Sequence, residues 1–162
     1  MRIEDTVAKV APHLDAERES RRIEDIESRC LEDLEPVAGA LQLVRKFHPD
    51  SWAIVTSSTT ALAKKKMKIT RMATPKTLIT SESVANGKPN PDCYLLAANT
   101  MGFEPKKCLV FEDSDVGVEA GMCAGSDVIA VGDDFTPNTR LVAAVRALSH
   151  IDVKRGFLVI RL

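Results

Sequence analysis

Short, continuous apolar runs alternate with segments of helical periodicity from residue 51 onward. The apolar runs predict strands over 52–56 (WAIVT), 76–80 (KTLIT), 107–112 (KCLVFE), 127–132 (DVIAVG) and in the terminal GFLVIRL. Between and after them, apolar spacing predicts helices over 59–70, 91–102, 116–125 and 137–150. Continuous apolar runs separated by helices are typical of parallel strands that are covered on both faces. The pattern therefore predicts an α/β fold with a doubly wound parallel sheet.

The first 50 residues show only helical patterns. Ile3, Val7 and Val10 recur at helical spacing, and Pro12 ends that segment. Residues 15–34 are rich in charge and carry a narrow apolar stripe, which predicts an amphipathic helix lying on another part of the molecule. A further helix is expected before Pro49, with apolar positions at Ala40, Leu43, Val44 and Phe47.

Composition and charge exclude several classes of partner. The 162 residues are 44% apolar and 28% charged, which suits one globular domain, alone or with a small appendage. The net charge is −1, with acidic and basic residues interspersed, so nucleic acid is not an expected partner. No apolar stretch reaches the about 20 residues of a membrane span, so no membrane contact is expected.

The four cysteines and the N-terminal residues favour a cytoplasmic location. The cysteines form no CxxC pair, which argues against a zinc site, and Cys108 and Cys123 are expected to be buried thiols of a reducing compartment. The start MRIEDTVAKV has mixed charge and does not resemble a secretory leader. No pattern indicates an oligomeric state.

Polar residues follow the predicted strands, at the edge where ligands bind in doubly wound sheets. Thr56 and Ser57 follow the first strand, and their hydroxyl and N–H groups suit a phosphate, although capping of the next helix also explains them. Lys88 is constrained between Gly87 and Pro89, which gives its ammonium a fixed direction of approach. A rigid turn with an exposed lysine is the alternative.

Two adjacent carboxylates, Glu112 and Asp113, end the strand at 107–112. Side-by-side negative charges at the end of a buried strand are costly unless a cation is near. Oxygen-only ligands of this kind suit Mg²⁺ shared with a phosphate. Capping of the following helix is an alternative for Asp113 but does not explain Glu112. The hydroxyls, the lysine and the acidic pair together predict a pocket for a phosphoryl group.

Three segments resemble motifs of the haloacid dehalogenase superfamily: WAIVTSS its second, NGKPNPDCYLLAA its third and LVFEDSDVGVEAGMCAG its fourth. The resemblance covers residues 36–132 and is closest to the small sugar- and polyol-phosphate phosphatases, including glycerol-3-phosphate and 2-deoxyglucose-6-phosphate phosphatases, and to β-phosphoglucomutase. A receiver domain of response regulators contains the same residue types, but in a different order.

This resemblance implies a Rossmannoid core over 35–162, a partial helical cap over 1–34 and Mg²⁺-dependent hydrolysis of a small phosphorylated metabolite. In that family, Thr56 or Ser57 would bind the phosphate, with Ser57 favoured. Lys88 would neutralise the phosphate and the nucleophile, and Glu112 and Asp113 would hold Mg²⁺ directly or through water.

The first motif of the family, an apolar strand ending in DxDGT or DxDGV, is missing from the sequence. The letters DSD at 113–115 belong to the fourth motif. Because that motif supplies the aspartate nucleophile and the central strand, we expect weak or no turnover, a gap in the sheet, and a chain truncated relative to longer relatives. The alternative is a catalytically dead module that binds phosphate or a partner.

Overall fold

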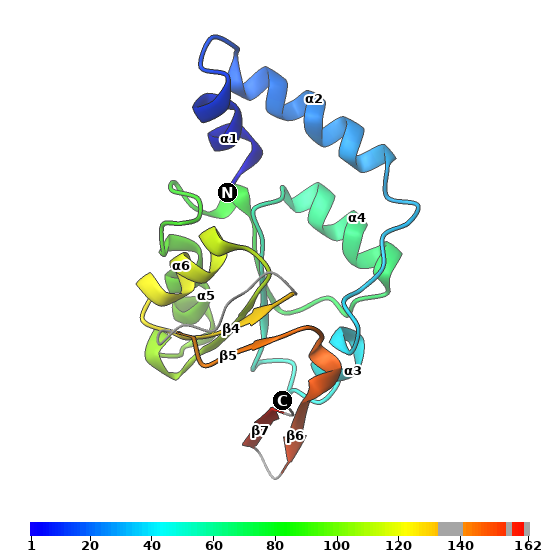
Figure 1. Ribbon diagram of the computed structural model, residues 1–162, viewed down its shortest axis with the longest axis vertical. Coiled ribbons are helices and arrows are strands. Elements are labelled where there is room, and N and C mark those ends of the chain that lie inside the picture. Colours follow the sequence, from blue (N-terminus) through cyan, green and yellow to red (C-terminus); the bar gives the residue numbers. More distant parts are fainter. Residues whose placement is uncertain (133–140, 155–156, 161–162) are drawn as a thin grey trace.

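The computed structural model describes residues 1–132, 141–154 and 157–160 (Figure 1). The helices are α1 (Ile3–Val10), α2 (Ala16–Arg29), α3 (Ala40–Val44), α4 (Thr60–Thr70), α5 (Asp92–Met101) and α6 (Asp115–Cys123). The strands are β1 (Ala53–Val55), β2 (Thr77–Ile79), β3 (Leu109–Glu112), β4 (Asp127–Val131), β5 (Ala143–Val145), β6 (Ile151–Lys154) and β7 (Phe157–Ile160). The expected strands and helices up to residue 132 are confirmed, most of them slightly shorter than predicted.

The strands form three separate sheets. β1 pairs with β2 in parallel, and β3, β4 and β5 form a second parallel sheet in that order. β6 and β7 form an antiparallel pair. Within the described ranges no strand hydrogen-bonds to both β1 and β3, so the sheet has the gap that the sequence predicts.

Helices cover both faces of the three-stranded sheet, as expected for a doubly wound fold. On one face α5 and α6 pack around Val110, Val128 and Ala130. On the other face Leu43 of α3 packs on Ile129 and Val131. β4 lies at the centre, and its residues Val128, Ile129 and Ala130 have no solvent exposure. The sequence explains this, because Asp127–Val131 has only apolar residues after its first position.

Local capping residues set the helix ends. The side chain of Thr59 accepts a hydrogen bond from the backbone of Leu62 at the start of α4, and Ser114 does the same for Gly117 at the start of α6. α5 ends at Gly102, whose φ of 76° is the left-handed conformation that glycine adopts without strain. The starts of α4 and α6 and the end of α5 are therefore specified by short-range sequence.

The helix predicted over 137–150 is wrong where it is described. Residues 137–140 lie outside the described residues, and Ala143–Val145 forms strand β5. β5 pairs with β4 in the register Ile129↔Ala143 to Val131↔Val145, and Val145 is buried. Pairing with the open edge of β4 thus outweighs the helical spacing of Leu141, Val145 and Leu148. Cys123, expected to be buried, is exposed, and Cys108 is intermediate.

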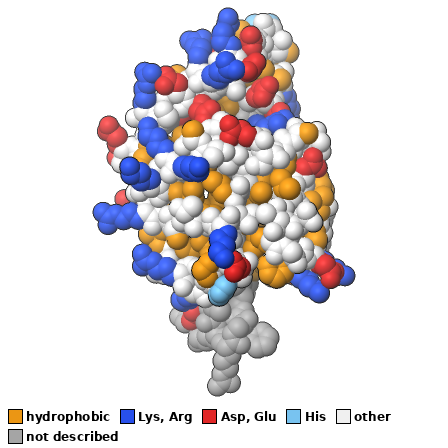
Figure 2. Space-filling model, turned by 180° about the vertical axis from the view of Figure 1, so that it is seen from behind, with side chains coloured by type: hydrophobic (Ala, Val, Ile, Leu, Met, Phe, Trp, Pro, Cys, Tyr) orange, Lys and Arg blue, Asp and Glu red, His pale blue; other side chains and the backbone are white. Residues whose placement is uncertain are grey.

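The hairpin of α1 and α2 stands apart from the sheets and touches α4 (Figure 1). α2 has no buried residue, and Lys66 of α4 forms an ion pair of 2.5 Å with Glu27. Seen from behind, lysine and arginine side chains mix with acidic ones over this upper part, and hydrophobic side chains gather below it (Figure 2). No helix in the described part of the chain is long and apolar enough to cross a membrane.

Candidate functional site

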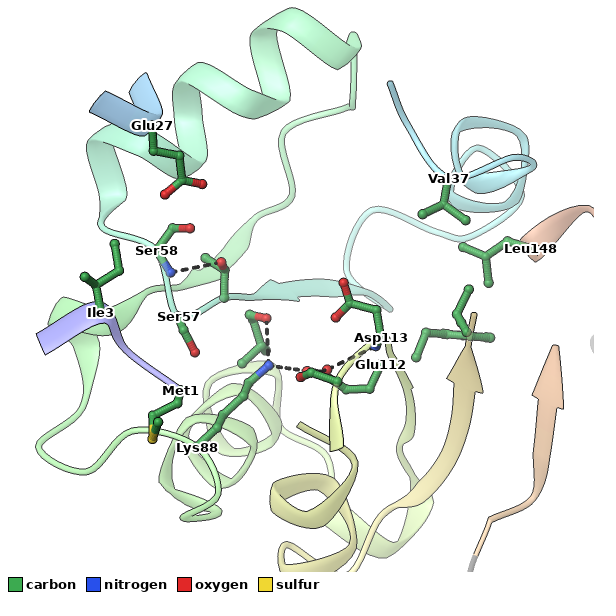
Figure 3. Close-up of a pocket in the computed structure, with 15 residues that line it drawn as sticks. Met1, Ile3, Glu27, Val37, Ser57, Ser58, Lys88, Glu112, Asp113 and Leu148 are labelled. Carbon is green, nitrogen blue, oxygen red and sulfur yellow. Dashed lines mark hydrogen bonds and ion pairs between the residues drawn. The ribbon is translucent and has the colours of Figure 1, made fainter. Parts of the chain in front are cut away.

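All five residues predicted for the site line one pocket of about 430 Å³. Thr56 and Ser57 follow β1, Lys88 comes from the loop before α5, and Glu112 and Asp113 lie at the end of β3. Figure 3 shows these side chains around a common space, with the apolar residues Val37 and Leu148 at its far side. The structure therefore brings together groups that lie up to 57 positions apart in the sequence, from Thr56 to Asp113.

Lys88 is buried, with 8% of its side chain exposed. Its ammonium forms a direct ion pair with Oε1 of Glu112 and lies 3.5 Å from the carbonyl oxygen of Val55. The ring of Tyr94 lies beneath it, 5.0 Å from Nζ to the ring centroid, a distance that allows a cation–π contact. The lysine is thus held in place from three directions.

Glu112 is also buried, and each of its oxygen atoms has two donors. Oε1 accepts from Lys88 and from the hydroxyl of Tyr94. Oε2 accepts from the backbone N–H of Asp113 at 3.2 Å and from the hydroxyl of Ser114 at 3.1 Å. Burial by itself raises the pKa of Glu112, but Lys88 and these hydrogen bonds outweigh it, so the pKa lies below its ordinary value. The carboxylate is therefore charged at neutral pH.

Tyr94 stays protonated beside this charge. Burial raises the pKa of its hydroxyl far above the ordinary value, and the negative charge of Glu112 raises it further. A neutral tyrosine donates a hydrogen bond to the carboxylate without adding charge. Tyr94 and Ser114 were not predicted as site residues. The only signal was their closeness in sequence to Lys88 and Glu112, because Tyr94 follows Lys88 by six positions on the next helix.

Gly117 allows the start of α6 to approach Glu112. A Cβ atom at position 117 would collide with the Glu112 carboxylate, and Gly117 itself is buried. The close approach also brings the positive N-terminal end of α6 near this negative charge, which stabilises it. The close contact with Glu112 thus explains why position 117 is a glycine.

Asp113 differs from Glu112 although the two are adjacent. Its side chain is exposed, and its carboxylate points into the pocket (Figure 3). No residue in the described ranges donates a hydrogen bond to this carboxylate or pairs with it. Asp113 is therefore available to a ligand, whereas Glu112 is already engaged.

The hydroxyl residues after β1 also differ in availability. Oγ1 of Thr56 accepts a hydrogen bond of 3.1 Å from the backbone N–H of Ser58, and its own N–H donates to Ile79. The hydroxyl of Ser57 has no partner among the residues that the structure covers, and it points into the space beside Lys88 (Figure 3). Thr56 therefore shapes the turn through its oxygen while its O–H can still donate, and Ser57 offers a hydroxyl with neither role taken.

The donor set fits Mg²⁺ only when a phosphate shares it. Within the described ranges no group of three His, Cys, Asp or Glu side chains is placed to hold a metal. Mg²⁺ commonly uses one or two carboxylates and completes its shell with waters and phosphate oxygens. Asp113 can supply one such carboxylate, whereas Glu112, whose oxygens each accept two hydrogen bonds, must release one of these donors before it can contact the ion or a water bound to it.

Comparisons with known proteins give the family. The family model for haloacid dehalogenase-like hydrolases matches residues 2–125. The chain is 40% identical over 119 residues to hexitol phosphatase A of Escherichia coli K12, which covers 72% of this chain and 55% of that protein. It is 32% identical over 142 residues to glycerol-1-phosphate phosphohydrolase 1 of Saccharomyces cerevisiae, covering 81% and 57%. The chain thus spans about half the length of these relatives.

A solved structure agrees with this result. The haloacid dehalogenase hydrolase of Entamoeba histolytica superposes with a TM-score of 0.77, covering 86% of this chain and 68% of that one at 22% identity. The shared architecture is a Rossmannoid α/β fold, in which the polar residues described above follow the strand ends. With the family model, the sequence relatives and the fold in agreement, this chain belongs to the haloacid dehalogenase-like hydrolases.

Proposed function

We propose that this protein is a Mg²⁺-dependent phosphatase of small sugar or polyol phosphates, and that the pocket binds the phosphate group. The single observation that carries the proposal is the convergence of Ser57, Lys88 and Asp113 on one pocket. A free hydroxyl, a fixed ammonium and a free carboxylate are the groups that a phosphate and its counterion need. The similarity to phosphatases of hexitol and glycerol phosphates supports this substrate class.

Each residue has a proposed role. Ser57 donates its hydroxyl to a phosphate oxygen; Thr56, whose oxygen accepts from the N–H of Ser58, still has its O–H to donate and is the alternative. Lys88 has three N–H donors, two of which face Glu112 and Val55, and the third binds the phosphate. Glu112 is a positioning residue that holds Lys88 in place.

Magnesium would be held by Asp113, and Glu112 would take part, directly or through water, only by releasing one of its present hydrogen-bond donors. A bound Mg²⁺ supplies positive charge that stabilises the charge on a transferring phosphoryl group. The protein's own side chains have two further roles. Ser57 and Lys88 orient the phosphate, and the apolar side chains of Val37 and Leu148 exclude water from the pocket.

The sequence contains no DxDGT or DxDGV motif, so we propose that the isolated chain binds phosphate but turns over slowly. Residues 1–34, which include the α1–α2 hairpin, would be part of a substrate-selecting cap on the core formed by 35–162. We also propose a cytoplasmic location for the protein. Its ligand would be a small phosphorylated metabolite, and neither nucleic acid nor a membrane would be a partner.

A binding and turnover experiment tests the proposal. Titration calorimetry with inorganic phosphate and Mg²⁺ should show saturable binding to the unchanged chain, lost in Asp113→Asn. Asp127→Asn, an exposed acid at the start of β4, is the matched control and should bind normally. Absence of binding to the unchanged chain would overturn the phosphate site. Hydrolysis of a glycerol phosphate at about 1 s⁻¹ or faster would contradict the slow turnover.

A further inference from the structure

Glu27 contributes a carboxylate to the pocket from outside the sheet. It lies on α2 and lines the pocket together with Ser57 and Ser58. Its side chain is 37% exposed, and Figure 3 shows its carboxylate directed toward Ser58, across the pocket from Lys88. This position borders the space that the organic part of a phosphate ester would occupy when its phosphate lies beside Lys88.

Contacts between α2 and the start of α4 fix this carboxylate. Lys66 pairs with Oε1 of Glu27 at 2.5 Å, and the ammonium of Lys65 donates to the carbonyl oxygen of Ser28 at 2.6 Å. One turn earlier, the hydroxyl of Thr59 donates to Glu24. The orientation of Glu27 is thus set before any ligand binds.

The second carboxylate oxygen of Glu27 has no partner in the part of the chain that the structure describes. Lys66, which pairs with the first oxygen, does not line the pocket. The pocket is therefore lined by the Glu27 carboxylate, a negatively charged hydrogen-bond acceptor, and not by the Lys66 ammonium. Such a group binds hydroxyl hydrogens and repels anions.

We propose that Glu27 is a specificity-determining residue that selects hydroxylated monophosphates over inorganic phosphate and over bisphosphates. Its free oxygen accepts a hydrogen bond from a hydroxyl of the carbon chain, and its charge disfavours a second phosphate at that position. This inference rests on the proposed function, because it assumes that the ester's phosphate lies beside Lys88.

Three ligands distinguish the contributions of the phosphate, of the hydroxyl groups and of a second phosphate to binding. They are inorganic phosphate, glycerol 3-phosphate and a hexose bisphosphate, each titrated with Mg²⁺. Glu27→Ala should weaken binding of the glycerol phosphate about tenfold, the effect of losing one hydrogen bond to a charged group, and leave the affinity for phosphate within about twofold. Glu27→Gln keeps an accepting oxygen but no charge. It should restore most of the glycerol phosphate affinity and bind the bisphosphate more tightly than the unchanged chain does.

Asp25→Asn on the same helix is the charge-matched control, since Asp25 pairs with Arg29 and does not line the pocket. It should leave the ratio of glycerol phosphate to phosphate affinity unchanged. An equal loss of affinity for both ligands in Glu27→Ala would show a merely structural role and overturn the inference, as would no loss for either ligand. If the unchanged chain binds none of the three ligands, the proposed function itself fails, and the inference fails with it.

Discussion

Lys88 and Glu112 depend on each other because both are buried and each supplies the other's counter-charge. A buried ion pair contributes little net stability when compared with an apolar pair, but removal of one partner leaves an uncompensated charge in the interior. Tyr94, Ser114 and the N–H of Asp113 satisfy the remaining capacity of the Glu112 carboxylate. The pair therefore behaves as one unit that positions an ammonium at the pocket.

Removal of the lysine alone should therefore be costly. Lys88→Met should lower the free energy of unfolding by about 3–5 kcal/mol, since Glu112 would stay buried without its partner. The double variant Lys88→Met/Glu112→Gln should recover a large part of this loss. Urea denaturation of the single and double variants measures both values. Strictly additive losses would show that the two side chains do not act as a unit.

The same pair predicts how stability depends on pH. Because the pKa of Glu112 in the folded protein lies below its ordinary value of 4.5, the carboxylate contributes stability above that pH. The contribution is lost as the pH falls below 4.5 toward the folded pKa. The difference in unfolding free energy between the unchanged chain and Glu112→Gln should be constant at pH 6–7 and shrink at pH 3–4. A difference independent of pH would contradict a charged Glu112.

The sequence predicts that the five residues converge on one pocket, but it does not predict their individual contacts. The residues at 56–57, 88 and 112–113 lie at one pocket because each follows a strand end or a rigid turn, and such positions are readable from short patterns. The contacts of Tyr94 and the position of Glu27 at the pocket were not predicted, since both side chains reach the pocket from other elements and no local pattern encodes this. The two adjacent acids also proved unequal: Glu112 is buried and its carboxylate has four hydrogen-bond donors, whereas Asp113 is exposed.

At the scale of elements, α6 and β3 are joined by the close approach at Gly117. Only Asp113 and Ser114 separate the end of the strand at Glu112 from the start of the helix at Asp115. This short turn leaves no room for a side chain at position 117. The tight turn keeps the Glu112 carboxylate between the helix start and Lys88. A substitution in this turn should therefore also alter the positions of the pocket side chains.

Gly117→Ala should destabilise the fold by about 1–3 kcal/mol, the usual cost of an added methyl group in a filled interior. It should also weaken phosphate binding, because the Glu112 carboxylate must move away from Lys88. Thermal unfolding and calorimetry give the two readouts. Cys123→Ala, at an exposed position on the same helix, is the control and should change neither. Normal stability and binding in Gly117→Ala would show that the approach at this turn is looser than described.

Elements with strong local signals up to residue 132 were predicted correctly, whereas β5 was predicted as helix and β6 was not predicted. The buried strand β4 follows from the apolar run in Asp127–Val131, and the end of α5 follows from Gly102. β5 was predicted as helix because its apolar spacing fits both periods. Only its pairing with the edge of β4, a contact between distant parts of the chain, decides between them.

At the scale of the whole molecule, the α1–α2 hairpin is held less firmly than the helices on the sheet. α2 has no buried residue and reaches α4 mainly through polar contacts. α5 by contrast buries Cys93, Tyr94, Ala97 and Ala98. Few buried apolar contacts are typical of segments that open locally at low free energy.

Hydrogen exchange should show this difference. Backbone amides of α2 should exchange through local opening, at least about tenfold faster than amides of α5, and high salt should speed α2 further by screening contacts such as Lys66 with Glu27. Mass spectrometry of exchanged peptides measures both helices in one sample. Equal protection of α2 and α5 would show that the hairpin is an integral part of the core.

An amide ¹H–¹⁵N NMR titration with inorganic phosphate and Mg²⁺ tests most directly whether Ser57, Lys88 and Asp113 form one phosphate site. Backbone amide signals of Ser57, Ser58 and Asp113 should shift together along curves with a single dissociation constant, and Asp127 at the far end of β4 should not shift. Signals that shift with different dissociation constants, or no shift at Ser57 and Asp113 at saturating phosphate, would contradict a single phosphate site.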